Sequence, residues 1–186
     1  MDRYRITDGV GVYFITFTIV DWLSVFVDET PITILIDSLK YCIAHKNLRV
    51  NAYVIMPNHL HAVVFDAAFD PLNLKRTLTD FRIFSGRQLS DYVDTRYSRA
   101  ISSVLKIGEL KDRERRFWQS GWHAEGIYSE HFLEQKVNYL HWNPCRKGLV
   151  RTPQDWRYSS ASYCLDGKQV DLPVSAVEWE GRDLRS

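Results

Sequence analysis

Cysteine is scarce in this chain of 186 residues, and the three cysteines, Cys42, Cys145 and Cys164, lack the close spacing of metal ligands. Their odd number also argues against a disulfide framework and favours a reducing, cytoplasmic setting. No uninterrupted apolar run approaches the length that spans a membrane, and residues 1–5 lead into no signal-peptide core. Repeats and low-complexity tracts are lacking as well. We therefore expect one soluble, cytoplasmic globular domain with no membrane partner.

Net charge is also nearly absent, at +1, but the charges are unevenly distributed. Residues 71–116 contain eleven Lys or Arg against six Asp or Glu, whereas residues 165–186 contain three basic and five acidic residues. A basic middle and an acidic end are expected when one face of a protein meets phosphates. An ordinary solvated helix face gives a similar surplus, so both interpretations stay open at this point.

Apolar patterning predicts strands and helices in alternation. Residues 11–20, rich in β-branched and aromatic side chains, are typical of a strand. Short strands at residues 50–56 and 62–65 flank turn chemistry at Pro57-Asn58. Helices are predicted from Pro31 to about Lys46, from Pro71 to about Leu89, and from Ser129 to about Asn143, with Pro144 as the stop.

Between the last two helices, residues 91–116 are predicted to form an irregular loop with short helical pieces, and residues 122–128 a further strand. The resulting order of elements predicts an α+β fold. Specifically, we expect a ferredoxin-like antiparallel sheet with helices packed on one face, in a single domain.

Two histidines, His59 and His61, follow the predicted turn at Pro57-Asn58. Because alternate side chains of a strand point to the same side, the two imidazoles project together. Two neighbouring imidazoles provide half of a divalent-metal site. Two partly buried histidines with other partners would show the same spacing, so the pair alone does not decide.

The predicted helix after Ser129 carries the second set of candidates. Tyr139 and Asn143 lie one turn apart, at the edge of an apolar stripe, where their side chains can reach a cleft. His141 points nearly opposite Tyr139, whereas Gln135, one turn before Tyr139, competes with Asn143 for any role. Two imidazoles and an amide oxygen can hold a divalent cation, and a tyrosine beside it can attack a phosphodiester.

Two segments, residues 51–64 (NAYVIMPNHLHAVV) and 137–150 (VNYLHWNPCRKGLV), together resemble the HUH single-tyrosine transposases. The chain looks most like their REP-associated branch, the RAYT proteins. Further agreement comes from Arg116-Phe-Trp118, from Asp155-Trp156 with Ser159-Ser160, and from the strand that opens at Gly11. The resemblance extends to about Cys164, which implies a domain at residues 1–164 and a tail at residues 165–186 of unknown role.

The resemblance implies a metal-dependent transposase that cleaves and rejoins single-stranded or hairpin DNA. His59, His61 and Asn143 would hold Mg²⁺ or Mn²⁺, while Tyr139 would form a 5′-phosphotyrosine link and leave a free 3′-hydroxyl. The family fold is ferredoxin-like. Members act as monomers or as homodimers, and the sequence does not decide between these. The insert at residues 91–116 is longer than in the shortest members.

Two alternatives remain at this stage. One is a catalytically inactive hairpin-DNA-binding protein derived from a transposase, and the other is a zinc hydrolase that would need Asp66 or His123 as a third ligand. For DNA contacts we predict five basic residues in or beside the basic segment: Lys75, Arg76, Arg82, Arg115 and Arg116.

Overall fold

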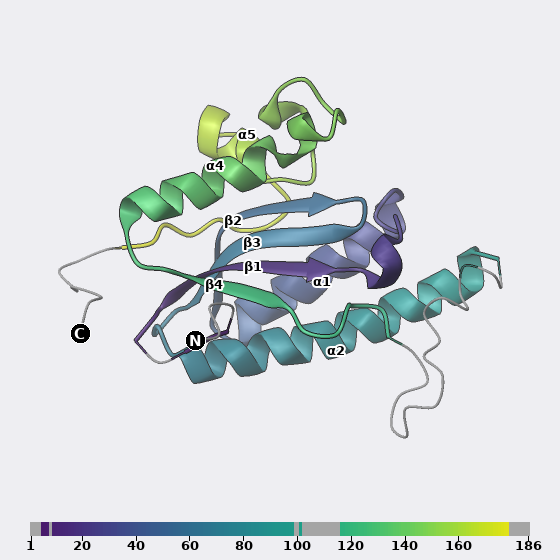
Figure 1. The fold of residues 1–186 in the computed structure, drawn as a ribbon, viewed down its shortest axis with the longest axis horizontal. Helices are drawn as coiled ribbons and strands as arrows, with labels where there is room; N and C mark the ends of the chain where they lie inside the picture. The colour runs from purple at the N-terminus through teal and green to yellow at the C-terminus, as the bar shows by residue number, and fades with distance from the viewer. Residues whose placement is uncertain (1–4, 8, 99–100, 102–115, 179–186) are drawn as a thin grey trace.

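A four-stranded antiparallel sheet organises the chain in the computed structural model, which describes residues 5–7, 9–98, 101 and 116–178. The order of strands across the sheet is β2-β3-β1-β4, so β1 and β3 are central (Figure 1). All neighbouring pairs are antiparallel. The strands coincide with the β-branched and aromatic runs of the sequence: β1 (Val12–Thr18), β2 (Leu48–Met56), β3 (His59–Asp66) and β4 (His123–Ile127).

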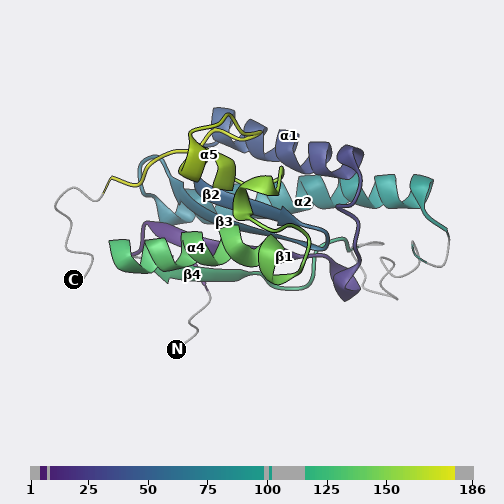
Figure 2. The same ribbon diagram turned by 90° about the horizontal axis from the view of Figure 1, so that it is seen from above.

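Two helices cover one face of the sheet (Figure 2). α1 (Glu29–His45) connects β1 to β2, and α2 (Pro71–Arg96) connects β3 to β4. Each connection joins two parallel strands, and right-handed crossovers bring both helices to the same side. The larger hydrophobic core lies between these helices and the sheet, and it includes Tyr13, Ile15, Leu35, Leu39, Leu74 and Leu78.

A further long helix, α4 (Glu130–Arg146), follows β4 and lies across the opposite face (Figures 1 and 2). Leu140 of α4 is completely buried and belongs to a second, smaller core with Phe14, Val54 and Val63. The predicted single-domain α+β fold with an antiparallel sheet is confirmed. The expected packing of helices on one face holds for α1 and α2 but not for α4, which leads to no further strand of this sheet and is therefore outside the crossover rule.

Two helix ends differ from the sequence prediction. α2 runs on from Leu89 to Arg96, because its buried stripe continues through Leu89 and Val93. α4 runs past Pro144 to Arg146, because the backbone N–H groups of Lys147 and Leu149 still bond to the carbonyls of Asn143 and Pro144. A proline in the last turn removes one hydrogen bond without ending the helix.

The outer edge of β2 is covered by the chain that follows α4. Two short helices, η2 (Pro153–Asp155) and α5 (Ala161–Asp166), flank a segment that bonds to β2 through Tyr158 and Ser160. The described part of the predicted tail, residues 165–178, continues along this edge, where Leu172 is buried and Ser175 N bonds to Val50 O. These segments protect the exposed hydrogen-bonding groups of an edge strand.

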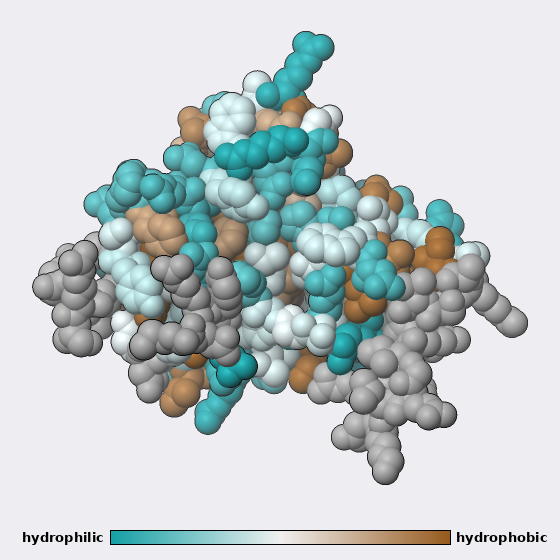
Figure 3. Space-filling model, viewed as in Figure 1, coloured by the Kyte–Doolittle hydropathy of each residue, from teal (hydrophilic) through white to brown (hydrophobic). Residues whose placement is uncertain are grey.

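The surface is mixed in polarity. On the face seen in Figure 3, hydrophobic residues lie in small separate groups among hydrophilic ones. Within the described ranges, every helix is too short or too polar to traverse a bilayer.

Candidate active site

The histidine pair lies at the start of a central strand, directly after the β2–β3 turn. His59 is opposite Thr18 of β1, and His61 is opposite Thr16. Both side chains point to the α4 face, are 8% and 7% exposed, and place their ring centres 4.5 Å apart at 71°. The alternation predicted from the sequence thus brings the two imidazoles together.

Each imidazole is oriented by a hydrogen bond at Nδ1. His59 Nδ1 donates to the side-chain oxygen of Asn58 at 2.6 Å, and His61 Nδ1 lies 2.8 Å from the hydroxyl oxygen of Thr16. An imidazole that donates from Nδ1 keeps the lone pair of Nε2 for another partner. Such anchoring is the usual support of a metal-binding histidine.

Both histidines are held neutral. Burial lowers the pKa of His59 to about 4, with a further contribution from the Lys147 ammonium. Burial also lowers the pKa of His61 to about 3, assisted by His59, Lys136 and His123. Neutral imidazole is the form that binds a metal, so no proton must be displaced from these rings near pH 7.

α4 brings Tyr139 to the histidine pair and carries Asn143 one turn further along. Ser129 begins this helix, because its hydroxyl accepts a hydrogen bond from Phe132 N. The Tyr139 ring is 44% exposed and lies 5.6 Å, centre to centre, from His61. Asn143 is buried, and its side-chain amide makes no hydrogen bond with the part of the chain that the structure describes. The amide is therefore available to a ligand.

The competing residues on α4 have other partners. Gln135 is exposed, and its side-chain nitrogen lies 2.9 Å from His131 Nε2. His141 is buried on the far side of the helix, where its Nε2 lies 2.8 Å from the Ser160 hydroxyl. Ser160 in turn bonds to both backbone groups of Tyr53 in β2.

Sequence reasoning missed three cations near the tyrosine or the histidine pair. Lys136 Nζ lies 5.0 Å from the centre of the Phe14 ring, which stacks on His61, and it also pairs with Glu125. Arg146 places its guanidinium 5.2 Å from the centre of the Tyr139 ring and donates to the Tyr139 carbonyl at 3.2 Å. Lys147 is close enough to His59 to lower its pKa.

Helical spacing could have identified these three cations. They lie three residues before, seven after and eight after Tyr139, which at about 100° per residue puts all three within roughly 80° of it around the helix. The surplus of basic residues at 71–116 drew attention to another part of the chain instead.

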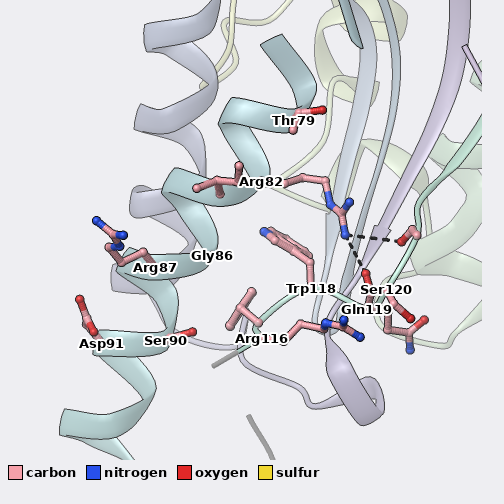
Figure 4. Close-up of a pocket in the computed structure, with 13 residues that line it drawn as sticks. Thr79, Arg82, Gly86, Arg87, Ser90, Asp91, Arg116, Trp118, Gln119 and Ser120 are labelled. Carbon is pink, nitrogen blue, oxygen red and sulfur yellow. Dashed lines mark hydrogen bonds between the residues drawn. The ribbon is translucent and has the colours of Figure 1, made fainter. Parts of the chain in front are cut away.

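Two of the predicted DNA contacts, Arg82 and Arg116, line a groove of about 870 Å³ between α2 and residues 116–121. Figure 4 shows Arg82 reaching from α2 to this segment, where it donates to the carbonyls of Gln119 and Gly121 at 2.7 and 3.5 Å. Arg82 thus holds the groove wall. Lys75 and Arg76 are exposed near the start of α2, and Arg115 lies outside the described residues.

The groove borders α2, whereas the histidine pair faces α4 across the sheet. The groove and the histidine pair both adjoin the end of β1. Gln119 N bonds to Thr18 O, and Thr18 lies opposite His59 in the sheet. The groove and the histidine pair are therefore neighbours around this end of the sheet.

His59, His61 and Asn143 offer nitrogen and oxygen donors that could hold a divalent cation. Within the described ranges, no group of three His, Cys, Asp or Glu residues could hold a metal, which removes support for a zinc hydrolase. Asp66, one of its candidate ligands, is buried and accepts hydrogen bonds from Ala68 N and the Asn73 amide. Two imidazole nitrogens and one amide oxygen leave open positions for phosphate oxygen and water.

Fold and site together define a class: a ferredoxin-like sheet with paired imidazoles on a central strand and a tyrosine on the helix above. No family model matches the sequence. The chain is 24% identical over 195 residues to a protein of Haemophilus influenzae named "Putative REP-associated tyrosine transposase", covering 100% of this chain and 97% of that protein. The chain is thus related to the REP-associated tyrosine transposases, and the resemblance predicted from its motifs is confirmed.

The fold is similar to that of a solved structure. The "REP associates tyrosine transposase bound to a REP hairpin" superposes with a TM-score of 0.61 at 18% identity, covering 97% of this chain and 96% of that chain. A "putative transposase" of Deinococcus radiodurans gives a TM-score of 0.46 at 18% identity, covering 75% of this chain and 95% of that chain.

Proposed function

We propose that the protein is a metal-dependent DNA transposase that cleaves and rejoins single-stranded DNA next to a hairpin, with Tyr139 as the nucleophile. The observation that carries the proposal is the arrangement of the site. Tyr139 has its ring 5.6 Å from that of His61, and Asn143, with an available amide, lies one turn further along α4. The hairpin is proposed because the solved relative is bound to a REP hairpin.

His59, His61 and Asn143 are the residues that would hold the cation. Both imidazoles are neutral and anchored at Nδ1, which leaves Nε2 as the ligand atom. A bound Mg²⁺ or Mn²⁺ would neutralise charge on the non-bridging oxygens of a phosphodiester.

In the proposed reaction, Tyr139 Oη attacks the phosphorus of one phosphodiester. A bond forms between Oη and phosphorus, and the bond from phosphorus to the 3′ oxygen breaks. The phenol proton passes to solvent, and the released 3′ oxygen takes up a proton from solvent. The DNA on the 3′ side of the break stays attached to Tyr139 through its 5′ phosphate. In the reverse sense, a 3′-hydroxyl attacks this phosphotyrosine, restores a phosphodiester and releases the phenol.

The cations of α4 position the reactants. Arg146 contacts both the ring and the carbonyl of Tyr139, so it restrains the nucleophile directly. Lys136 and Lys147 lie beside His61 and His59 and supply positive charge where a phosphate backbone would enter. Binding of the DNA strand and orientation of the phenol are thus assigned to α4 and to Lys147, which directly follows it.

A covalent-adduct assay tests the proposal. The wild-type protein and Tyr139→Phe are incubated with labelled DNA hairpins carrying single-stranded flanks, in Mg²⁺ or Mn²⁺, and separated under denaturing conditions. The wild type should form a protein–DNA adduct and a shortened product with a 3′-hydroxyl, and Tyr139→Phe should form neither. Tyr128→Phe, which alters another exposed tyrosine just before α4, is the matched control and should leave the adduct unchanged. Equal adduct from Tyr139→Phe would disprove the assignment.

A further inference from the structure

Trp22 is an exposed residue with an uncommon backbone conformation. It ends η1 (Val20–Trp22), the short helix that follows β1. Asp21 and Trp22 have φ values of 51° and 57°, and both lie in the left-handed region that bulky side chains rarely adopt. The indole is nevertheless 59% exposed. Strained backbone that presents a large apolar ring to solvent is a pattern of ligand-binding positions.

The Trp22 ring is fixed next to the histidine pair. Its centre lies 6.3 Å from that of His59, at an angle of 78°. Asn58 ties the two residues together, because its side-chain nitrogen donates to Trp22 O at 3.4 Å while its side-chain oxygen accepts from His59 Nδ1 at 2.6 Å. The same amide therefore orients a proposed metal ligand and the backbone that carries the indole.

Trp22 contacts one of the buried imidazoles, and Tyr139 contacts the other. Successive ring contacts join Trp22 to His59, His59 to His61, and His61 to Tyr139, at 6.3, 4.5 and 5.6 Å between centres. The two end rings are exposed, at 59% and 44%, and the two imidazoles between them are not. A phosphate located over the imidazoles would thus have the nucleophile beside His61 and an exposed indole beside His59.

We infer that Trp22 is a stacking platform for an unpaired nucleobase adjoining the phosphodiester at His59 and His61. The inference rests on the proposed function, since that function places the phosphodiester there. Every base offers an aromatic face, and stacking on tryptophan needs no particular sequence. The Lys147 charge beside His59 suits the phosphate that accompanies such a base. Trp22 would fix the path of the strand through the site and thereby the position of the cut.

The test combines changes in Trp22 with changes in the DNA. Hairpins with random single-stranded flanks are selected for binding to the Tyr139→Phe protein, so that a probe is obtained whether or not cleavage occurs. Abasic sites are then introduced at each flank position. In the Tyr139→Phe background, one abasic position should weaken binding by roughly 5- to 150-fold, the effect of losing one base–aromatic stack. Trp22→Ala should weaken binding of intact DNA by a similar factor. The abasic site at that position should then cause no further loss of affinity in the Trp22→Ala protein.

Two variants and one measurement on the unaltered side chain complete the design. Trp22→Phe should retain most of the affinity, and Tyr41→Ala, which removes an exposed aromatic ring on α1, should retain all of it. With Trp22 intact, 2-aminopurine at the sensitive position should be quenched on binding, which does not depend on how a Trp22 variant folds. Two results would overturn the inference. One is that Trp22→Ala and each abasic site weaken binding independently, so that their factors multiply at every position. The other is that 2-aminopurine is quenched at no flank position.

Adduct formation separates this inference from the proposed function. Coupling between Trp22 and one base, without any adduct from the protein with Tyr139 intact, would support the platform and refute the transposase chemistry. An adduct without coupling at any base would refute the platform and support the chemistry.

Discussion

Removing the hydroxyl that anchors His61 should weaken metal binding without touching a proposed ligand. Thr16→Val replaces the hydroxyl oxygen, 2.8 Å from His61 Nδ1, with a methyl group of similar size. His61 is only 7% exposed, so its Nδ1–H would be left buried without an acceptor. The cost to the free energy of unfolding should be about 1–3 kcal/mol. Loss of such an anchoring partner typically weakens metal affinity about 10- to 100-fold.

Mn²⁺ affinity, read from the electron paramagnetic resonance of free Mn²⁺, and urea unfolding without metal measure the two effects separately. Thr18→Val is the matched control. Thr18 lies two residues further along β1 on the same face, opposite His59, and its side chain makes no hydrogen bond to any residue within the described ranges. It should change neither quantity.

The opposite hydrogen-bond direction would give a different result. If the Thr16 hydroxyl donated to His61 Nδ1, the proton of the neutral ring would be on Nε2, and Nε2 could not bind a cation. Thr16→Val would then leave metal affinity unchanged or raise it. Equal Mn²⁺ affinity in Thr16→Val and Thr18→Val would therefore refute the proposed ligand geometry.

Four further outcomes are expected. His59→Ala and His61→Ala should abolish adduct formation while reducing hairpin affinity much less, because cations elsewhere hold the strand; equal losses in gel-shift and adduct assays would contradict this. Burial lowers the pKa of His141 to about 4. As pH falls, this histidine is therefore protonated in the unfolded chain before it is protonated in the folded protein, and the free energy of unfolding should drop between about pH 6.5 and pH 4. In urea unfolding at those two pH values, His141→Gln should remove about 3 kcal/mol of that drop, and an undiminished drop would show that another group is responsible. Lys147→Ala should flatten the salt dependence of hairpin binding by about one unit of slope if it contacts one phosphate, and an unaltered slope would exclude that contact. Ser129→Ala should lower the stability of the protein by about 1 kcal/mol through loss of the α4 cap, and an unchanged urea midpoint would argue against the cap.

The fold was largely predictable, because local patterns agreed with the final topology. The runs at β1, β2 and β3 are rich in β-branched and aromatic residues, which favours strands over helices. The N-caps at Asp70 and Ser129 mark where α2 and α4 begin. The side of the sheet that α4 covers was not predictable. That choice depends on which face of β1 and β3 is still uncovered once α1 and α2 have packed, and no local pattern in α4 encodes it.

The candidate site was predictable where strand or helix periodicity fixes direction. Alternation in β3 aligns His59 with His61, and a single helical turn aligns Tyr139 with Asn143. Contacts between elements were not predictable. The Thr16–His61 hydrogen bond depends on the register of β1 against β3. The position of Trp22 depends on a left-handed backbone at Asp21, which the residue types at this point of the sequence do not predict. Arg82 was predicted as a DNA contact, and only the fold reveals its role in holding residues 119–121.

His141 faces away from the proposed chemistry, yet its contact with Ser160 fixes how far α4 is turned about its own axis. A slip of one residue would rotate the helix by about 100° and carry the phenol out of reach of the imidazoles. The orientation of Tyr139 thus depends on the opposite face of α4, through a buried contact that Ser160 connects to Tyr53 of β2. Substitutions at Ser160, which contacts the side of α4 away from Tyr139, would misorient the tyrosine while leaving every proposed ligand in place.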